Sequence, residues 1–93
     1  MSIQKYQIFL HVMEAGSISR AAENMGLTQS AVSHSLSSLE EEFGFRLLTR
    51  SRSGVRLSSE GKRILPAIRD ILSAEERLRV FVSGGDGKTH GSL

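Results

Sequence analysis

The sequence predicts a mainly α-helical fold of three helices and a two-stranded β-hairpin, followed by one further long helix. Two observations support this prediction. Apolar residues recur with helical spacing in four stretches, with glycines or capping residues between the first three. Between the third and fourth stretches, residues 45–58 contain two short strand-like runs around a polar turn. With 93 residues, of which 39% are hydrophobic, the chain fits one small domain and not a multidomain enzyme.

The first helix is predicted for residues 3–13, and Ser2 is placed to cap its first turn. Its core stripe consists of Ile3, Tyr6, Phe9, Leu10 and Met13. Ile8 and Val12 project from the other side of the same helix, so this helix has more apolar surface than one packing partner would cover. We therefore expect a second partner for it.

A helix–turn–helix is predicted for residues 18–37. Gly16 is free to take the left-handed conformation that ends the first helix, and Ser17 can cap the second. Gly26 supplies the tight turn, and Thr28 can cap the third helix. The core stripe of that third helix consists of Val32, Leu36, Leu39 and Phe43, and Gly44 ends it.

The outward face of the third helix carries small polar side chains in its N-terminal half. A helix whose outward face is slim fits the major groove of B-DNA and brings its first turn to the base edges. The candidate DNA-contacting residues on this helix are Thr28, Gln29, Ser30, Ser33, His34 and Ser37. Gln29 can make two hydrogen bonds to adenine, and serine hydroxyls can donate or accept. An ordinary surface helix with solvent-facing serines is the alternative interpretation.

The segment after this helix is basic. Residues 43–63 carry a net charge of +5, whereas residues 1–42 carry −3 and the remainder is balanced. The hairpin, or wing, is predicted for residues 46–57, and the arginines on or beside it that can reach a phosphate or a narrow minor groove are Arg50, Arg52 and Arg56. A solvated charged loop is the alternative, but the neighbouring helix–turn–helix favours contact with DNA. For Glu40–Glu42, at the far end of the third helix, we expect a solvated acidic patch that interacts with nearby arginines.

The longest periodic stretch predicts a helix over residues 59–83. Its apolar stripe consists of Ile64, Ile68, Ile71, Leu72, Leu78 and Val82. A domain of this size rarely needs so long a helix for itself. The Gly-rich segment of residues 84–93 is expected to be a flexible tail.

Several protein classes are disfavoured by what the chain lacks. It has no cysteine, no apolar run of membrane-spanning length and no export signal, so we expect a cytoplasmic protein that does not bind membranes. His11 and His90 have no partners at metal-ligand spacing. No serine lies in a nucleophile-elbow sequence, and no pair of carboxylates is set among apolar residues. We therefore expect no metal, no cofactor and no enzyme activity.

Four motifs together resemble the DNA-binding region of the LysR-type transcriptional regulators of bacteria. They are F-x-x-V-x-E-x-G-S-I-S-x-A-A at residues 9–22, T-Q-S-A-V-S-H at residues 28–34, L-E-E-E-F-G at residues 39–44, and L-L-T-R with G-V-R-L-S-x-E-G over residues 47–61. The resemblance covers about residues 1–82 and implies a winged helix-turn-helix. It also implies base and phosphate contacts by Gln29, Ser30, Ser33 and His34, and minor-groove or backbone contacts by the wing arginines.

The resemblance further implies an organisation for the chain. Residues 1–58 form the DNA-binding domain, and the stripe of residues 59–83 pairs antiparallel with its copy in a homodimer, near the first helix. Such a dimer would account for Ile8 and Val12 and would bind inverted-repeat half-sites in double-stranded DNA. Members of this family normally continue into a domain that senses a small-molecule effector, so we expect this chain to be a fragment. The alternative function is a protein-interaction or dimerisation module without specific DNA binding.

Overall fold

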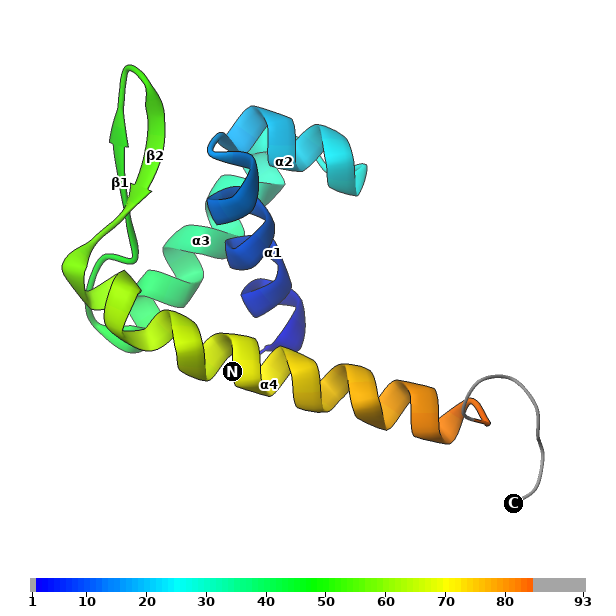
Figure 1. Cartoon of the computed structure of the whole chain (residues 1–93). Helices are drawn as coiled ribbons and strands as arrows, with labels where there is room; N and C mark the ends of the chain where they lie inside the picture. Colours follow the sequence, from blue (N-terminus) through cyan, green and yellow to red (C-terminus); the bar gives the residue numbers. More distant parts are fainter. Residues whose placement is uncertain (1, 85–93) are drawn as a thin grey trace.

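A computed structural model describes residues 2–84 of the chain and confirms the predicted fold class (Figure 1). The elements in chain order are α1 (Ile3–Ala15), α2 (Ile18–Met25), α3 (Gln29–Phe43), β1 (Leu48–Ser51), β2 (Gly54–Leu57) and α4 (Ser59–Val82). The two strands pair antiparallel and form the wing. Except for residue 84, the tail predicted for residues 84–93 lies outside the described residues.

The first helix, α1, is the element against which most others pack. It contacts α2, α3, β2 and α4, and Figure 1 shows it between the helix–turn–helix and the long α4. Ile8 and Val12 are only 2% and 0% exposed. The second partner that these residues predict is therefore part of the same chain. The expectation that a second copy accounts for them is wrong, because elements of this chain cover both sides of α1.

Polar contacts also join α1 to α3. The Nζ of Lys5 donates a hydrogen bond to Ser38 Oγ at 2.7 Å and lies 3.8 Å from Glu42 Oε2. Beside them, burial raises the pKa of the Tyr6 hydroxyl, and the negative charge of Glu42 raises this pKa further. The Tyr6 ring packs against Phe43, with the ring centroids 6.2 Å apart. These contacts fix the orientation of α3 relative to the core.

Side-chain caps start three of the four helices. Ser17 Oγ accepts the Arg20 N–H at 3.1 Å, and Thr28 Oγ1 accepts the Ala31 N–H at 3.0 Å, as predicted. Ser58 caps α4 in the same way. The cap predicted for Ser2 is wrong, because its side chain accepts no hydrogen bond from the first turn of α1. Burial of the α1 side chains stabilises that helix instead.

The base of the wing is attached to α3 through Glu40. Glu40 Oε2 accepts the backbone N–H groups of Leu47 and Leu48, at 2.7 and 3.2 Å. The expectation that Glu40 belongs to a solvated acidic patch is therefore wrong. Glu40 is half-buried where the chain turns from α3 into β1. Its carboxylate provides the acceptor that the two backbone N–H groups need at this turn.

We predict that Glu40→Gln lowers the free energy of unfolding by about 1–2 kcal/mol, because two charge-assisted hydrogen bonds lose their ionised acceptor. Urea denaturation of the 93-residue chain measures this loss. Glu41→Gln is the matched control, since Glu41 is exposed on the next position of α3 and its replacement should change the stability by less than about 0.5 kcal/mol. Equal losses in the two variants would contradict the role of Glu40.

Candidate nucleic-acid interface

The outward face of α3 is open to solvent over its N-terminal half. Of the six predicted contact residues on this helix, five are exposed and Ser33 is half-buried. The exposed residues are Thr28, Gln29, Ser30, His34 and Ser37. The Thr28 hydroxyl already accepts the capping hydrogen bond from Ala31, whereas Gln29 and Ser30 lie in the first turn of α3, the position from which a helix reads base edges.

The three predicted arginines of the wing point in different directions. In the strand register, Leu48 pairs with Leu57 and Arg50 with Val55, whereas Thr49 pairs with Arg56. Paired residues share one face of a sheet, and the face alternates along the strand. Arg50 therefore lies on the face of buried Leu48, Arg56 lies on the opposite face, and Arg52 lies in the two-residue turn at the tip.

Arg50 connects the wing to α3. Its Nη2 donates a hydrogen bond to Ser33 Oγ at 3.5 Å, a long contact between two predicted DNA-binding residues. Arg50 thus lies beside the outward face of α3, although the two residues are separated by 17 positions in the sequence.

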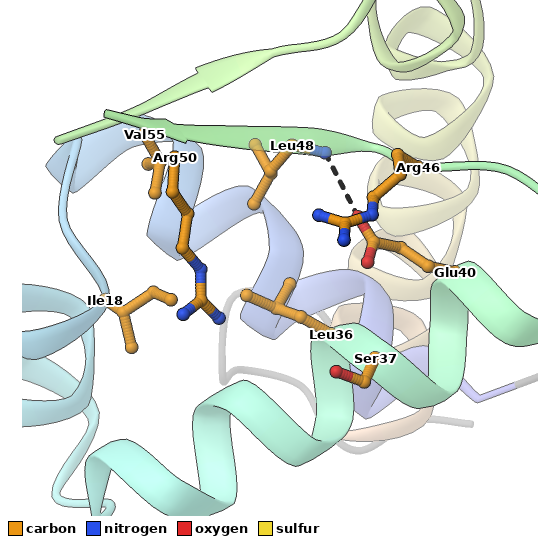
Figure 2. A pocket seen from close by; sticks show the side chains of 8 residues that line it. All are labelled: Ile18, Leu36, Ser37, Glu40, Arg46, Leu48, Arg50 and Val55. Atoms are coloured by element: carbon orange, nitrogen blue, oxygen red, sulfur yellow. Dashed lines mark hydrogen bonds between the residues drawn. The ribbon is translucent and has the colours of Figure 1, made fainter.

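A groove of about 480 Å³ separates α3 from the wing. Its lining residues, shown as sticks in Figure 2, are Ile18, Leu36, Ser37, Glu40, Arg46, Leu48, Arg50 and Val55. Arg46 and Arg50 extend into the groove from the wing side, and Ile18, Leu36, Leu48 and Val55 are its apolar lining residues (Figure 2). Sequence reasoning did not single out Arg46. Its charge belongs to the basic segment of residues 43–63, but its direction depends on how Glu40 holds the chain at residues 47 and 48.

The arginines of this region form no ion pair within the described part of the chain. The ion pairs among residues 2–84 join Lys5 to Glu42, and Arg79 to Glu75 and Glu76. None of them uses an arginine of residues 46–56, and all four of these arginines are exposed. The surface formed by α3 and the wing is therefore suited to a polyanion.

The predicted stripe of α4 divides into two parts. Ile68 is buried in the core of its own chain, and three further residues pack partly against that core, namely Ile64, Ile71 and Leu72. Leu78 and Val82 are 61% and 75% exposed, and Phe81, which the stripe did not include, is 82% exposed. The outer end of α4 therefore presents apolar side chains to solvent.

Among residues 2–84, no group of three His, Asp or Glu side chains is arranged to hold a metal ion. No helix in the same part of the chain is long and apolar enough to span a membrane.

The helix–turn–helix, the antiparallel wing and the basic groove between them define a winged helix-turn-helix protein. The family model for the bacterial regulatory helix-turn-helix proteins of the lysR family matches residues 3–62. The chain belongs to this LysR family, whose members among the curated relatives are transcriptional regulators.

Two curated relatives illustrate the similarity. The chain is 33% identical over 94 residues to YvbU, an uncharacterised HTH-type transcriptional regulator of Bacillus subtilis (strain 168), with 100% of this chain and 32% of YvbU covered. It is 37% identical over 81 residues to the HTH-type transcriptional activator BauR of Pseudomonas aeruginosa, with 87% and 27% covered. The chain thus spans about a third of the length of the curated relatives that it matches.

Two solved structures share the fold over most of their length. The CbnR_DBD–DNA complex has a TM-score of 0.79 and 31% identity, and the match covers 83% of this chain and 88% of that one. The BenM_DBD/benA site 1 DNA complex has a TM-score of 0.82 and 26% identity, and the match covers 89% and 96%. Both are structures of those proteins with DNA.

The tip of the wing packs on the turn between α1 and α2. The Val55 N–H donates to the Gly16 carbonyl at 3.1 Å, and a Cβ built on Gly54 would lie 2.3 Å from the same oxygen. Gly54 also has a φ of +121°, which L side chains rarely adopt. We predict that Gly54→Ala destabilises the chain by about 2 kcal/mol or more and accelerates hydrogen exchange at the Val55 amide, because the wing must shift.

The matched control for this variant is Gly26→Ala. Gly26 also has a positive φ, of +68°, but no atom lies within 4 Å of a Cβ placed there, so only the backbone strain of about 1–2 kcal/mol applies. Urea denaturation and hydrogen exchange measure both variants. A Gly54→Ala variant that is no less stable than Gly26→Ala, with unchanged exchange at Val55, would show that the wing does not depend on this contact.

Proposed function

We propose that this chain binds double-stranded DNA sequence-specifically, as the DNA-binding part of a bacterial LysR-type transcriptional regulator. The observation that carries the proposal is the exposed polar face of α3 beside four wing-side arginines that form no ion pair within residues 2–84. A helix with such a face enters the major groove, and arginines beside it contact phosphates or the minor groove. The DNA complexes of CbnR and BenM, whose domains share this fold, support the same mode of binding.

In this proposal the residues have different tasks. Gln29, Ser30 and Ser33 contact bases or phosphates from the first turns of α3, and His34 and Ser37 extend that contact along the helix. Thr28 contributes through the cap that orients the start of α3. Arg52 reaches the flanking backbone or the minor groove from the tip of the wing, and Arg50 and Arg56 contact DNA from its two faces.

We further propose that the regulator acts as a homodimer formed through α4. The exposed apolar side chains of Leu78, Phe81 and Val82 support pairing with a second copy, and Ile64, Ile71 and Leu72 have partly exposed surface to add. Ile68 is the member of the predicted stripe with the least surface to offer, because it is buried in its own domain. A two-fold dimer would bind inverted-repeat half-sites.

Binding to chromosomal DNA places this function in the cytoplasm. The curated relatives are about three times as long as this chain, and we assign no small-molecule effector to these 93 residues.

The second candidate function is a dimerisation module that does not bind DNA specifically, which the apolar end of α4 favours. Selection from a duplex library at two salt concentrations, with the molecular mass measured in parallel, separates these two functions. Enrichment of an inverted repeat by a dimer supports DNA recognition. A dimer without salt-sensitive DNA binding supports the dimerisation module.

We predict that Gln29→Ala relaxes the preference at one base pair of the selected site by about 1–3 kcal/mol while most of the non-specific affinity remains, because a base-edge contact is lost. Competition binding with single-base variants of the site measures this change. Gln4→Ala is the matched control, since Gln4 is exposed on α1 at a distance in sequence from the helix–turn–helix. An equal loss of affinity on every sequence would assign Gln29 to the backbone instead.

For the wing tip, we predict that Arg52→Ala weakens binding to all sequences alike. It should lower the slope of log Kobs against log salt concentration by about 0.9, because one phosphate contact is lost. Fluorescence anisotropy over a salt series measures the slope. Arg77→Ala removes the same charge from the exposed surface of α4 and should leave the slope unchanged. An unchanged slope for Arg52→Ala would exclude its phosphate contact.

A further inference from the structure

Two arginines line the groove between α3 and the wing. Arg46 comes from the segment before β1 and Arg50 from within β1, and both line the groove of about 480 Å³ together with Ser37 (Figure 2). Both side chains are exposed, and neither forms an ion pair among residues 2–84. Their charges are therefore available to a ligand that enters from solvent.

We propose that Arg46 and Arg50 act as a clamp that holds a single backbone phosphate of duplex DNA in this groove. The proposal rests on the proposed function and adds Arg46 to the binding residues. Guanidinium groups bind phosphate oxygens through pairs of parallel hydrogen bonds, so two of them can surround one phosphate. The groove borders the outward face of α3 at Ser37. In the proposed mode of binding, a DNA strand whose bases face α3 would bring its backbone to this border.

Apolar side chains line the groove beside the two arginines. These apolar lining residues come from several elements, namely Ile18, Leu36, Leu48 and Val55. A mixed lining of cationic and apolar groups is compatible with a DNA backbone, in which a deoxyribose adjoins each phosphate. The Ser33 hydroxyl accepts a hydrogen bond from Nη2 of Arg50, and the guanidinium keeps its remaining donors for the ligand.

One negative charge lies in the same groove. The Glu40 carboxylate is a lining residue, but its Oε2 accepts the N–H groups of Leu47 and Leu48, and the two arginines leave the lining with a net positive charge. The same contacts position the clamp, because they fix the backbone directly after Arg46. The Arg46 carbonyl in turn accepts a hydrogen bond from Ser58 Oγ. The base of Arg46 is thus held before the ligand binds, which reduces the entropy lost on binding.

The test measures how the slope of log Kobs against log salt concentration changes for binding to a fluorescent duplex of random sequence, about three helical turns long. It compares the 93-residue chain with its Arg46→Gln, Arg50→Gln and double variants. When two arginines share one phosphate, each single variant keeps that phosphate partly neutralised. We expect each single variant to lower the slope by clearly less than about 0.9, and the double variant to lower it by about 0.9. An Arg69→Gln/Arg77→Gln double variant removes the same charge from exposed positions on α4 and should keep the slope of the original chain. Circular dichroism and molecular mass confirm that each variant is folded and equally associated.

Two other results would overturn the clamp. Losses of about 0.9 in each single variant and about 1.8 in the double variant would assign the arginines to two separate phosphates. An unchanged slope in all three variants would show that the groove holds no phosphate. If the double variant does not fold, Arg46→Lys/Arg50→Lys replaces it, because lysine keeps the charge but cannot form paired hydrogen bonds to a phosphate. The clamp then predicts a lower affinity for DNA with an unchanged slope. Failure of the original chain to bind the duplex in a salt-dependent way would refute the proposed function itself, which is distinct from a failure of the clamp alone.

Discussion

The burial of α1 on several sides is the constraint from which the arrangement of the other elements follows. A 93-residue chain forms only a small hydrophobic core, so the rest of the same chain must cover a helix with two apolar sides. Val12 and Phe9 are fully buried on α1, and α2, α3, β2 and α4 all pack on this helix. The surface that we propose to contact DNA is therefore positioned by a helix that takes no part in that contact.

Most features that depend on neighbouring residues in the sequence could be predicted, although the cap at Ser2 could not. The caps at Ser17 and Thr28 involve groups three residues apart, and α4 begins at Ser59 as its periodicity indicates. The exposure of Gln29 and His34 likewise follows from the position of the core stripe on the same helix. In each case the physical cause lies within one or two helical turns, which a sequence pattern samples directly.

Features that depend on contacts between distant segments could not be predicted in this way. The pattern showed that Ile8 needs a partner, but not that the partner lies in the same chain. It also did not distinguish Glu40 from the adjacent glutamates, because only the approach of Leu47 and Leu48 gives its carboxylate two donors. The direction of Arg50 depends on the strand register, which a charge count does not contain.

The position of Glu40 links the stability of the fold to the proposed binding of DNA. Its carboxylate holds the wing at the distance from α3 that opens the groove, yet its negative charge opposes a phosphate in that groove. A neutral side chain there would remove this repulsion of the phosphate but would hold the wing less firmly. The backbone N–H groups of Leu47 and Leu48 lessen this conflict, because they donate hydrogen bonds to Glu40 Oε2 and partly offset its negative charge. The geometry of the interface and the stability of the fold therefore depend on one carboxylate, and neither can be strengthened there without weakening the other.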